Sequence, residues 1–433
     1  MILPNIPKCV AFILRRLEED GHQAYIIGGA MRDACLNRPV TDWDVATSAR
    51  PDAIKLIFKY KKLFMLRRET VTIVDLGHHV EVTPFRGVEN TLLGDLSHRD
   101  FTINAMAFDL DKSEVIDPHG GRLDIRNRLI RAVGNPMERF REDPLRLMRA
   151  VRLATELGFR FEDQTIRDIG CMASLLSSVS TERIREELIK ILICPRPSVA
   201  FKTMIRTGLL AHFLPELLEG YLKRQNHYHR YTIFRHVMKT VDKVEPEPAM
   251  RLTALLHDIA KPRVRIKAGG EWRFHGHEES SALLAEKILD RLKFSNDLSE
   301  KVTNLIRHHM IGYDSSWSDG AIRRLIRRVG VSQVMDLLAF RRADISAHGV
   351  GDQRIRLLCE LEKRVRDQIE SEAAISIKDL AVDGHAVMAI TGLSPGPEVG
   401  KILKDLNERV LDRPELNCER ELTALLEEMK ARD

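Results

Sequence analysis

Two acidic residues separated by one position, Asp42 and Asp44, have the types and spacing that metal-dependent phosphate chemistry requires. They lie in VTDWDVAT, which has the composition of a β-strand, and alternate residues of a strand project from the same face. Two carboxylates on one face repel each other unless a cation lies between them, and Mg²⁺ binds carboxylate and phosphate oxygens. The sequence therefore predicts a magnesium site here. The alternative is a pair of aspartates that stabilises a turn.

A glycine pair precedes these acids. In AYIIGGAMRD a predicted strand runs into Gly28 and Gly29, and a helix is expected from about Ala30. Glycine lets backbone N–H groups approach a ligand and a helix N-terminus favours phosphate, although such turns also occur without a ligand. Glu81, in HHVEVTPF, would add a third carboxylate unless it is an ordinary surface residue. Three carboxylates beside a phosphate-binding turn suit two-metal phosphoryl or nucleotidyl transfer, in which the metals activate a hydroxyl and stabilise departing pyrophosphate.

Histidines and aspartates in the second half of the chain form another ordered set of metal-ligand types. His257 and Asp258 are adjacent in LTALLHDIAKP, and His236 precedes them. Imidazole and carboxylate together bind a divalent transition metal, which lowers the pKa of a bound water for attack on phosphate. The set continues with His275, His277, His308, His309 and Asp344. Histidines that pack between helices are the alternative, which we favour for His275 and His309.

Short β-rich runs and helical patterns alternate over the first 130 or so residues. The β-rich runs are AYIIGG, TVTIVDL, HVEVTPF, AMAFDL and VIDP, and the helical patterns are AFILRRLEED and DAIKLIF. They predict an α/β head with a mixed sheet. Beyond Asn135 and Pro136 nearly every segment has helical periodicity and no strand is convincing, so a long helical body is expected to follow.

The composition limits the classes of protein to which the chain can belong. With 433 residues, 44% of them hydrophobic and 30% charged, the chain is expected to form three or four globular domains and is not of the disordered class. Lysine and arginine exceed the acidic residues by only five, which argues weakly for nucleic acid. Six cysteines without a CxxC pair exclude a recognisable zinc ribbon or disulfide framework. No signal peptide or membrane span is recognised, so a cytoplasmic location is expected.

Five motifs extend the first site along the chain: GGAMRD, DWD, HRDFTINAMA (98–107), IDPHGGRLDI (116–125) and REDPLRLMRAVR (141–152). In this order they resemble the signature motifs of the class II tRNA nucleotidyltransferase and bacterial poly(A) polymerase family. TERIREELIKIL (181–192) resembles the family's next helical motif. The resemblance implies an α/β nucleotidyltransferase head with a polymerase beta-like palm and a mixed sheet, followed by an all-α neck and body, an HD domain and a helical tail.

The resemblance also implies roles for head residues. Gly29 and Arg32 would contact the triphosphate of an incoming nucleotide, and Asp42 and Asp44 would bind Mg²⁺ and carry catalysis together with Glu81. The remaining residues of the expected nucleotide site in the head are Gly28, Arg99, Asp100 and Asn104.

In the neck, Asp143 and Arg146 would read the base edge by resemblance, with Arg149 and Arg152 lining the same pocket. The chemistry agrees, because aspartate accepts from an exocyclic amino group and arginine donates to a ring nitrogen or carbonyl oxygen. These positions are three apart, so we expect them along one face of a helix. Asp143 before Pro144 also has the sequence of a helix N-cap.

One segment departs from the family pattern. Only the twelve residues GVENTLLGDLSH, 87–98, separate Arg86 from Arg99. Family members that build a whole CCA end carry a longer flexible loop here, which helps the pocket switch from cytidine to adenosine, whereas members that add only CC have it shortened. His98 also replaces the arginine usual at that position. We therefore expect CC addition from CTP, with the final A left to a separate A-adding enzyme; full CCA addition with ATP is the alternative.

The order H…HD…H…H…D resembles the HD metal-dependent phosphohydrolase superfamily, and several members of the nucleotidyltransferase family carry such a domain. The resemblance implies His236, His257, Asp258 and Asp344 as ligands of a divalent transition metal, and His277 and His308 are candidates for a second metal or for phosphate contact. The expected domains are the head (1–135), the neck and body with base pocket and RNA-binding surface (136–225), the HD domain (226–355) and the tail (356–433).

The expected substrate is the 3′ acceptor end of a tRNA. Arg183, Arg185 and the arginine cluster at 322–328 are candidates for phosphate contacts, with a solvated helix surface as the alternative. A poly(A) polymerase shares the head motifs. A pure HD phosphohydrolase with a degenerate head and a non-catalytic RNA-binding module are disfavoured by the intact pair Asp42 and Asp44.

Overall fold

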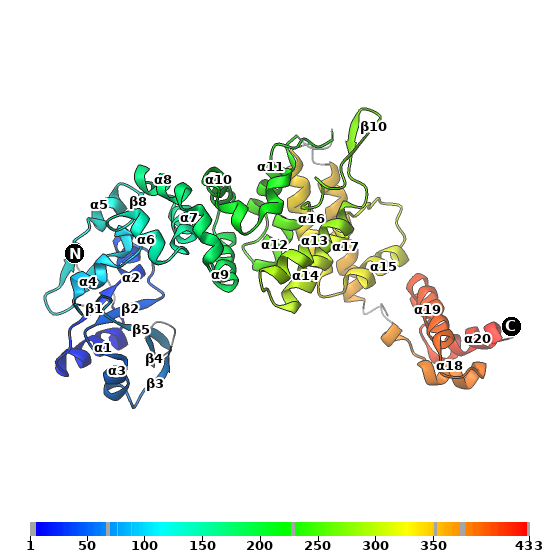
Figure 1. Cartoon of the computed structure of the whole chain (residues 1–433). Coiled ribbons are helices and arrows are strands. Elements are labelled where there is room, and N and C mark those ends of the chain that lie inside the picture. The colour runs from blue at the N-terminus through cyan, green and yellow to red at the C-terminus, as the bar shows by residue number, and fades with distance from the viewer. Residues whose placement is uncertain are drawn as a thin grey trace. The chain divides into compact units, whose positions relative to one another are not determined.

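The computed structural model describes residues 6–65, 70–75, 77–87, 89–226, 230–349, 353–371 and 377–430. The chain folds into two compact units, Met1–Pro215 and Glu216–Asp433 (Figure 1). The first unit combines the α/β head with the helical neck, and the second contains the segments expected to form the HD domain and the tail. Among the described residues, none of the helices combines the length and the apolar character that crossing a membrane requires.

A seven-stranded mixed sheet is the core of the head. The strand order is β3-β4-β5-β2-β1-β6-β7, with β2 and β5 parallel and the other neighbours antiparallel. The strands are β1 (Ala24–Ile27), β2 (Trp43–Thr47), β3 (Lys62–Met65), β4 (Val71–Asp75), β5 (His78–Pro84), β6 (Ala107–Asp109) and β7 (Glu114–Ile116). Each β-rich run of the sequence contains one of these strands, which confirms the expected α/β head. Strand β3 was not expected from the sequence.

Different helices cover the two faces of this sheet. Helices α1 (Lys8–Glu19) and α3 (Pro51–Ile57) pack together against one face (Figure 1), on which Ile26 is fully buried. On the other face Ile27 packs with Leu92 and Leu96 of a short helix.

That short helix is α4 (Leu92–Ser97), and it occupies the segment in which a shortened loop was expected. Asp44 is the register partner of Ile27 on β1 and of Glu81 on β5, so its side chain lies on the sheet face that α4 covers. The sheet and α4 therefore place the acids predicted for catalysis on an interior face of the first unit.

Helices dominate the chain after the head, as expected. In the first unit they are α5 (Gly121–Arg126), α6 (Pro136–Glu142), α7 (Arg146–Leu157), α8 (Asp163–Cys171), α9 (Thr181–Leu192) and α10 (Ser198–Arg206). The expectation that no strand follows residue 135 is wrong, because β8 (Leu129–Ile130) pairs with β9 (Arg160–Phe161), and β10 (Ile266–Ala268) pairs with β11 (Glu271–Arg273). Strands of two or three residues are too short to show an alternating pattern in the sequence.

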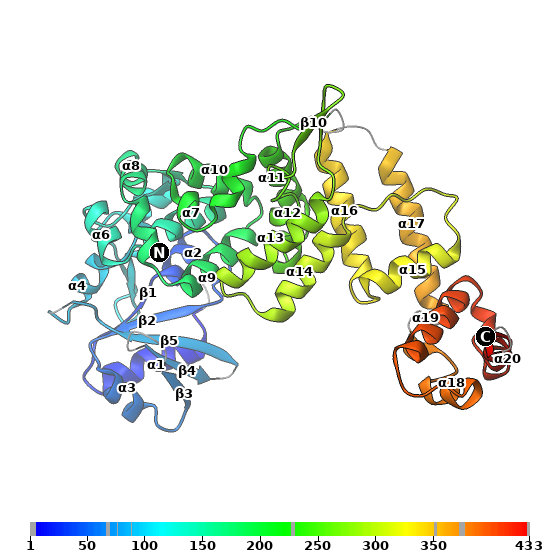
Figure 2. The ribbon, with the colours of Figure 1, turned by 45° about the vertical axis from the view of Figure 1, so that its right-hand side comes forward.

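The second unit contains a helical layer and a smaller tail (Figure 2). The layer consists of α11 (Ile233–Lys243), α12 (Pro248–Leu256), α13 (His277–Arg291), α14 (Asn296–His308), α15 (Asp319–Val329), α16 (Val334–His348) and α17 (Gln353–Glu370). The tail consists of α18 (Gly384–Thr391), α19 (Pro397–Asp412) and α20 (Glu419–Lys430). The tail has its own apolar cluster, which includes Val387, Leu406, Val410 and Leu422.

The arginine cluster of α15 holds the tail. Arg324 Nε lies 2.8 Å from Glu408 Oε2, and Arg324 NH2 lies 2.6 Å from Asp412 Oδ2. Arg327 also pairs with Glu408, and buried Arg323 donates to the carbonyl oxygen of Leu411. These three guanidinium groups are therefore engaged with α19, and the expectation that the 322–328 cluster contacts RNA phosphates is wrong for them.

Packing explains one glycine of the IDPHGGRLDI motif. A Cβ atom added at Gly121 would lie 2.3 Å from the carbonyl oxygen of Thr102, so α5 can approach the 102–104 turn only with glycine there. The backbone N–H of Gly121 donates to Asp117 Oδ1 over 2.7 Å, which anchors the start of α5. This motif supports the fold.

We predict that Gly121→Ala lowers the free energy of unfolding by about 1–3 kcal/mol, because the added methyl group overlaps a backbone carbonyl. Thermal denaturation measures the change. Gly170→Ala is the control, since that glycine lies in α8 and its Cβ would meet nothing closer than 3.9 Å. An unchanged melting temperature in Gly121→Ala would contradict this account of the packing.

Candidate active site and candidate metal centre

A cavity of 590 Å³ lies in the first unit, on the sheet face that carries Asp44. Its volume is within the range of small-molecule sites. Head and neck both contribute to its lining, and all head and neck residues expected at the nucleotide site take part: Gly28, Gly29, Arg32, Asp42, Asp44, Glu81, Arg99, Asp100, Asn104, Asp143, Arg146, Arg149 and Arg152. Segments that are far apart in sequence are thus brought to one cavity.

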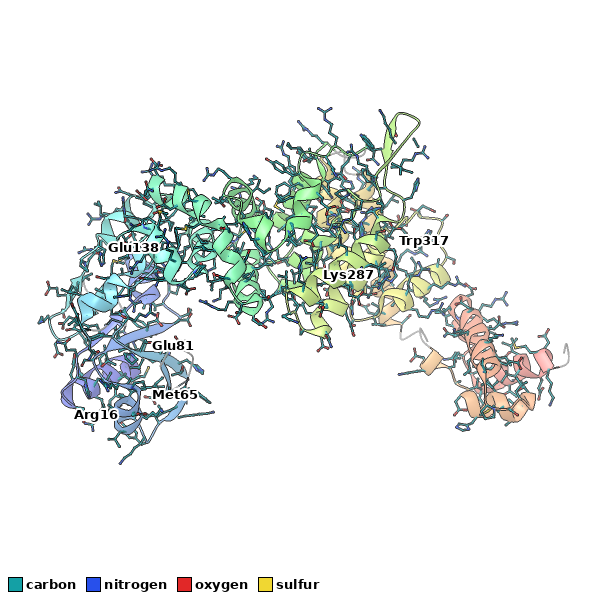
Figure 3. The ribbon with its side chains drawn as sticks, in the orientation of Figure 1. Arg16, Met65, Glu81, Glu138, Lys287 and Trp317 are labelled. Carbon is teal, nitrogen blue, oxygen red and sulfur yellow. The ribbon has the colours of Figure 1, made fainter. Side chains whose placement is uncertain are left out.

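The acidic end of the cavity repels anions and would hold a cation. Asp44 and Glu81 are register partners on the parallel strands β2 and β5, and Asp42 directly precedes β2 (Figure 3 labels Glu81). Burial, opposed by Arg99 and reinforced by the charges of Glu81 and Asp42, raises the pKa of Asp44 to about 6. A carboxyl group whose ionised form is disfavoured in this way fits a divalent cation, which would restore the ionised form.

The glycine turn leaves room beside these acids. Gly28 has φ of 71°, and an added Cβ would lie 3.0 Å from Asp44 Oδ2 and 3.1 Å from Arg99 NH1. Any side chain at this position would therefore be strained and would obstruct both groups. Helix α2 (Gly29–Cys35) begins directly after Gly28, one residue earlier than expected from the sequence.

A chain of hydrogen bonds links the turn to the neck. Arg32 NH1 donates to Asn104 Oδ1 over 3.0 Å, and Asn104 Nδ2 donates to Asp100 Oδ1 over 3.1 Å. The other oxygen of Asp100 accepts from Arg149 Nε over 2.9 Å. Burial alone would raise the pKa of Asp100, but the charge and hydrogen bonds of Arg149 outweigh it and hold that pKa far below its usual range. The pair is therefore ionised and anchors α7 on the head.

At the end of the cavity where a base was expected to bind, the four residues predicted to lie along one helix do not all do so. Arg146, Arg149 and Arg152 lie on α7, but Asp143 precedes the helix in an extended conformation. Its Oδ1 accepts from the N–H of Leu145 over 3.3 Å and its Oδ2 accepts from Arg183 over 2.8 Å. The N-cap of α7 is Leu145, which has no side-chain capping bond, so the N-cap alternative for Asp143 is wrong. Asp143 is the C-cap of α6, holds the turn that leads into α7, and lines the cavity.

Arg146 is held by two backbone carbonyl oxygens and by Glu142, whose Oε2 accepts from Arg146 NH1 over 2.8 Å. Arg146 NH2 donates to the carbonyl oxygen of His98 over 2.7 Å and its NH1 to that of Arg139 over 3.1 Å. The residue is 8% exposed, so these contacts determine its orientation. The contact between His98, at the end of the 87–98 segment, and Arg146 uses main-chain atoms, so side-chain types do not predict it.

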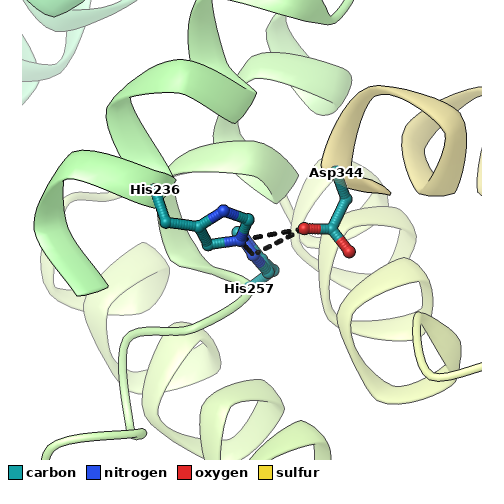
Figure 4. Close-up of side chains that lie close together, drawn as sticks. All are labelled: His236, His257 and Asp344. Atoms are coloured by element: carbon teal, nitrogen blue, oxygen red, sulfur yellow. Dashed lines mark hydrogen bonds and ion pairs between the residues drawn. The ribbon is translucent and has the colours of Figure 1, made fainter. Parts of the chain in front are cut away.

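Buried side chains form a separate cluster in the second unit. His236, His257 and Asp344 place one ligand atom each within 4.8 Å of one another (Figure 4). His236 Nε2 lies 2.9 Å from Asp344 Oδ1 and 3.2 Å from His257 Nε2. All three side chains are almost fully buried, and they come from α11, from the residue that ends α12 and from α16. The sequence analysis predicted all three as ligands of one metal, and the structure brings the three side chains together.

A second group of ligand type adjoins the first. It consists of Asp258, His277 and His309, whose ligand atoms also lie within 4.8 Å of one another. His308 does not belong to either group within the described residues. Helix α14 ends at His308, which is half-buried, whereas His309 is 1% exposed and turns into the cluster. The structure thus places His309, which was expected to pack between helices, among the possible ligands, and it does not place His308 there.

The protonation pattern in this cluster suits metal ligation. His257, His277 and His309 each direct Nδ1 at a backbone carbonyl oxygen, of Ala254, Phe274 and Ile306. A carbonyl only accepts, so Nδ1 carries the proton and Nε2 is directed inward, the arrangement typical of metal-binding histidines.

The buried atoms that lack a hydrogen-bond partner among the described residues include Asp258 Oδ1 and His277 Nε2 of this cluster. Burial lowers the pKa of His277 and holds that of His309 well below its usual value. Burial alone would lower the pKa of His257, but the charges and hydrogen bonds of Asp258 and Asp344 outweigh it and raise that pKa to about 9. Imidazoles gathered around two buried carboxylates fit one or two divalent cations, and a cation would displace the extra proton of His257. Lys261 Nζ, 2.7 Å from Asp258 Oδ2, supplies positive charge next to the second group.

Family models match three segments of the chain. Residues 24–131 match the poly A polymerase head domain, residues 158–220 match the probable RNA and SrmB-binding site of polymerase A, and residues 279–428 match a putative domain 2 of tRNA nucleotidyltransferase. The first match covers the strands and glycine turn of the head, and the second covers α8 to α10 of the neck.

Relatives match over nearly the whole length. A CCA-adding enzyme of Enterococcus faecalis is 30% identical over 95% of this chain and 93% of its own, and one of Lactobacillus gasseri is 31% identical over 98% of each. Among solved structures, the CCA-adding enzyme of Bacillus stearothermophilus in complex with CTP has 27% identity and a TM-score of 0.74, covering 98% of this chain and 97% of its own. A CCA-adding enzyme of Thermotoga maritima complexed with tRNA, at 20% identity and a TM-score of 0.58, covers 99% of this chain and 97% of its own and shares the fold.

We predict that Mg²⁺ raises the melting temperature of the wild-type protein by a few degrees and leaves that of Asp44→Asn unchanged. A cation that binds only the folded state at ten times its Kd adds about 1.4 kcal/mol of stability. Without Mg²⁺, Asp44→Asn should melt at or above the wild type, because an amide avoids the cost of a buried charge near Glu81. Asp111→Asn, at an exposed turn, is the control. An equal response to Mg²⁺ in Asp44→Asn would contradict the assignment.

Proposed function

The chain belongs to the CCA-adding enzyme family of tRNA nucleotidyltransferases, and we propose that it extends the 3′ acceptor end of tRNA by template-independent transfer of nucleotides from CTP. One observation carries this proposal: the acids Asp42, Asp44 and Glu81, the open turn at Gly28 and the arginines of the neck all line one cavity. Acidic residues alone would be compatible with many metal sites, and arginines alone with any phosphate-binding site, so the combination carries the proposal.

The reaction joins the terminal ribose hydroxyl of the RNA to the α-phosphate of the nucleotide, and pyrophosphate leaves. Asp42, Asp44 and Glu81 would hold Mg²⁺, which when bound supplies charge stabilisation for the attacking oxygen and the leaving pyrophosphate. The turn at Gly28 admits the phosphates, and Arg32 and Arg99 offset their negative charge. The protein needs to contribute little beyond position and charge, which a preorganised cavity provides.

Base selection would rest on Asp143 and Arg146. A carboxylate accepts from the N4 amino group of cytosine and a guanidinium donates to its N3 and carbonyl oxygen, so no nucleic-acid template is required. Adenine offers an N6 amino group and N1 to the same pair. The pocket therefore distinguishes the two bases by the position of these side chains, since their chemical types suit both.

We further propose that the enzyme adds CC and leaves the terminal A to a separate A-adding enzyme. Residues 92–97 of the short 87–98 segment form α4, whose N-cap Thr91 accepts from the N–H of Gly94 over 3.1 Å. The carbonyl oxygens at its end bind Arg139 and Arg146. Because hydrogen bonds hold α4 at both ends, the helix supports a single orientation of Arg146. A pocket with a single orientation of Arg146 would not readily change shape to accept adenine.

The direct test is extension of tRNAs that end at position 73, at C74 or at C75, with CTP and ATP alone and together. We expect two C residues to be added to the first, one to the second and little A to the third. Asp42→Ala should lower the rate at least about 100-fold, which is the scale of losing a group that stabilises transition-state charge.

Efficient addition of A to tRNA ending in CC would refute the restriction to CC and leave nucleotidyl transfer intact. Repeated addition of A to unrelated RNA would instead identify a poly(A) polymerase. Undiminished activity in Asp42→Ala would contradict the site itself.

The cluster of histidines and aspartates favours a second activity, and we propose that the second unit binds divalent transition metal and hydrolyses a phosphate ester. Two adjoining three-residue groups support two metal ions: His236, His257 and Asp344 form one group, and Asp258, His277 and His309 form the other. When bound, such ions lower the pKa of water for attack on phosphorus.

Metal analysis of the purified protein tests this second proposal. We expect one to two equivalents of a divalent transition metal in the wild type, a clear loss in His309→Ala, and wild-type content in His308→Ala, which is the neighbouring control. Hydrolysis of 2′,3′-cyclic nucleotides and of nucleotide monophosphates should follow metal content. No bound metal and no hydrolysis would reduce the cluster to a structural role.

A further inference from the structure

Asp95 is a fully buried carboxylate on α4, where it lies beside the buried apolar residues Leu92 and Leu96. Its Oδ2 accepts from Arg99 Nε over 3.0 Å and lies 2.9 Å from Arg99 NH2, and its Oδ1 accepts from the backbone N–H of Arg86 over 3.2 Å. A buried carboxylate is costly unless such donors satisfy it. The carboxylate is satisfied here by two arginine residues that both line the 590 Å³ cavity.

Arg99 has a specific place in this cavity. It is 8% exposed, and its NH1 lies 3.1 Å from the position of a Cβ added at Gly28. Asp44 Oδ2 approaches the same position to 3.0 Å. The guanidinium is therefore close to the turn predicted to admit phosphates and close to an acid predicted to hold Mg²⁺. Without another carboxylate to hold it, Arg99 would be drawn towards Asp44 and would compete with a cation there.

We propose that Asp95 is a positioning residue for nucleotide binding, which holds Arg99 against the phosphate-binding turn and away from Asp44. The inference rests on the proposed nucleotidyl transfer and extends it to a residue outside the expected site. Asp95 does not line the cavity and acts through Arg99, since the fork of two N–H donors fixes the plane of the guanidinium.

Asp95 lies on α4, and this helix also holds a second arginine of the cavity. Helix α4 holds Arg99 through the side chain of Asp95, and it holds Arg146 through the carbonyl oxygen of His98. One helix thus sets the position of an arginine at each end of the cavity. The phosphate end and the base end are therefore coupled through the 87–98 segment.

The test compares Asp95→Asn with Asp124→Asn. Asp124 is likewise buried in the head and accepts from an arginine, Arg131 Nε over 3.1 Å, but it does not line the cavity or contact a residue that does so through its side chain. We measure the Kd for CTP in Mg²⁺ buffer on the protein alone, kcat and KM for CTP with tRNA ending at position 73, and the melting temperature.

We expect Asp95→Asn to raise both Kd and KM for CTP roughly tenfold with kcat within about twofold, because a charge-assisted contact that fixes a binding group is lost. Asp124→Asn should lower the melting temperature and leave Kd and KM unchanged. In an Arg99→Lys background, Asp95→Asn should add less than about a twofold effect, since the two residues act as one unit. If Asp95→Asn does not fold, Asp95→Ser replaces it in the same measurements.

A Kd for CTP that is unchanged in Asp95→Asn, or a full tenfold effect that persists in Arg99→Lys, would overturn the proposal. The Kd is measured without RNA, so it tests the role of Asp95 even if the protein proved inactive on tRNA. A wild-type protein that binds CTP but extends no tRNA would refute the proposed function and leave this inference standing.

Discussion

The ion pair between Asp100 and Arg149 is the contact on which the first site depends. It joins a turn of the head to the helix of the neck, and Arg149 NH2 and Nε both donate to one oxygen of a carboxylate that is 7% exposed. The side chain of Arg149 is 35% exposed, so water partly screens the guanidinium, whereas the loss of Arg149 would leave a buried carboxylate without its charge partner. Through Asn104 the same carboxylate is connected to Arg32 beside the glycine turn. The residues proposed to bind the triphosphate and those proposed to read the base line one cavity, and this contact is one of those that hold the head and neck together there.

The charges within the cavity divide into two kinds. Arg149 and Arg152 are paired with carboxylates, of Asp100 for the first and of Glu156 and Glu187 for the second, and these pairs hold structure. Asp44 is different, because burial raises its pKa to about 6, opposed by Arg99 and reinforced by Glu81 and Asp42. Such an arrangement is unfavourable in the protein alone and becomes favourable when a cation binds. The cluster around Asp258 and Asp344 shows a related pattern, with several imidazoles directed at two buried carboxylates.

The sequence predicts much of this structure, for reasons that are local. Asp42 and Asp44 are two residues apart, and strand geometry alone places such side chains together. His257 and Asp258 directly follow α12, in which every residue from Ala249 to Leu256 is buried, so their burial follows from the apolar run before them. The contacts that escaped prediction are those between distant segments or through the backbone. The hydrogen bond from Arg146 to the carbonyl oxygen of His98 cannot be predicted from side-chain types. The arginines of α15 were expected to contact RNA, because their acidic partners on α19 lie more than 80 residues away in the sequence.

Two missed residues could have been found from spacing. Asp95 precedes Arg99 by four positions, the spacing of a helical ion pair, although the six-residue helix that supports it has little periodic signal. His308 and His309 are adjacent, and the apolar positions of α14, including Val302, Leu305 and Ile306, indicate which helical face is buried. His309 continues the face of Val302 and Leu305, at spacings of seven and four residues, so the sequence contained the correct choice.

The central claim is that Asp42 and Asp44 hold the metal ion of nucleotidyl transfer, and exchange of ligand type tests it most directly. In Asp44→Cys a thiolate replaces a carboxylate oxygen, and sulfur binds Mg²⁺ poorly but binds Mn²⁺ and Cd²⁺. The account predicts that this variant loses CTP incorporation in Mg²⁺ and regains a substantial part of it in Mn²⁺ or Cd²⁺, with CTP affinity retained. Activity that is unaffected in Mg²⁺, or that no thiophilic metal restores while CTP still binds, would contradict it.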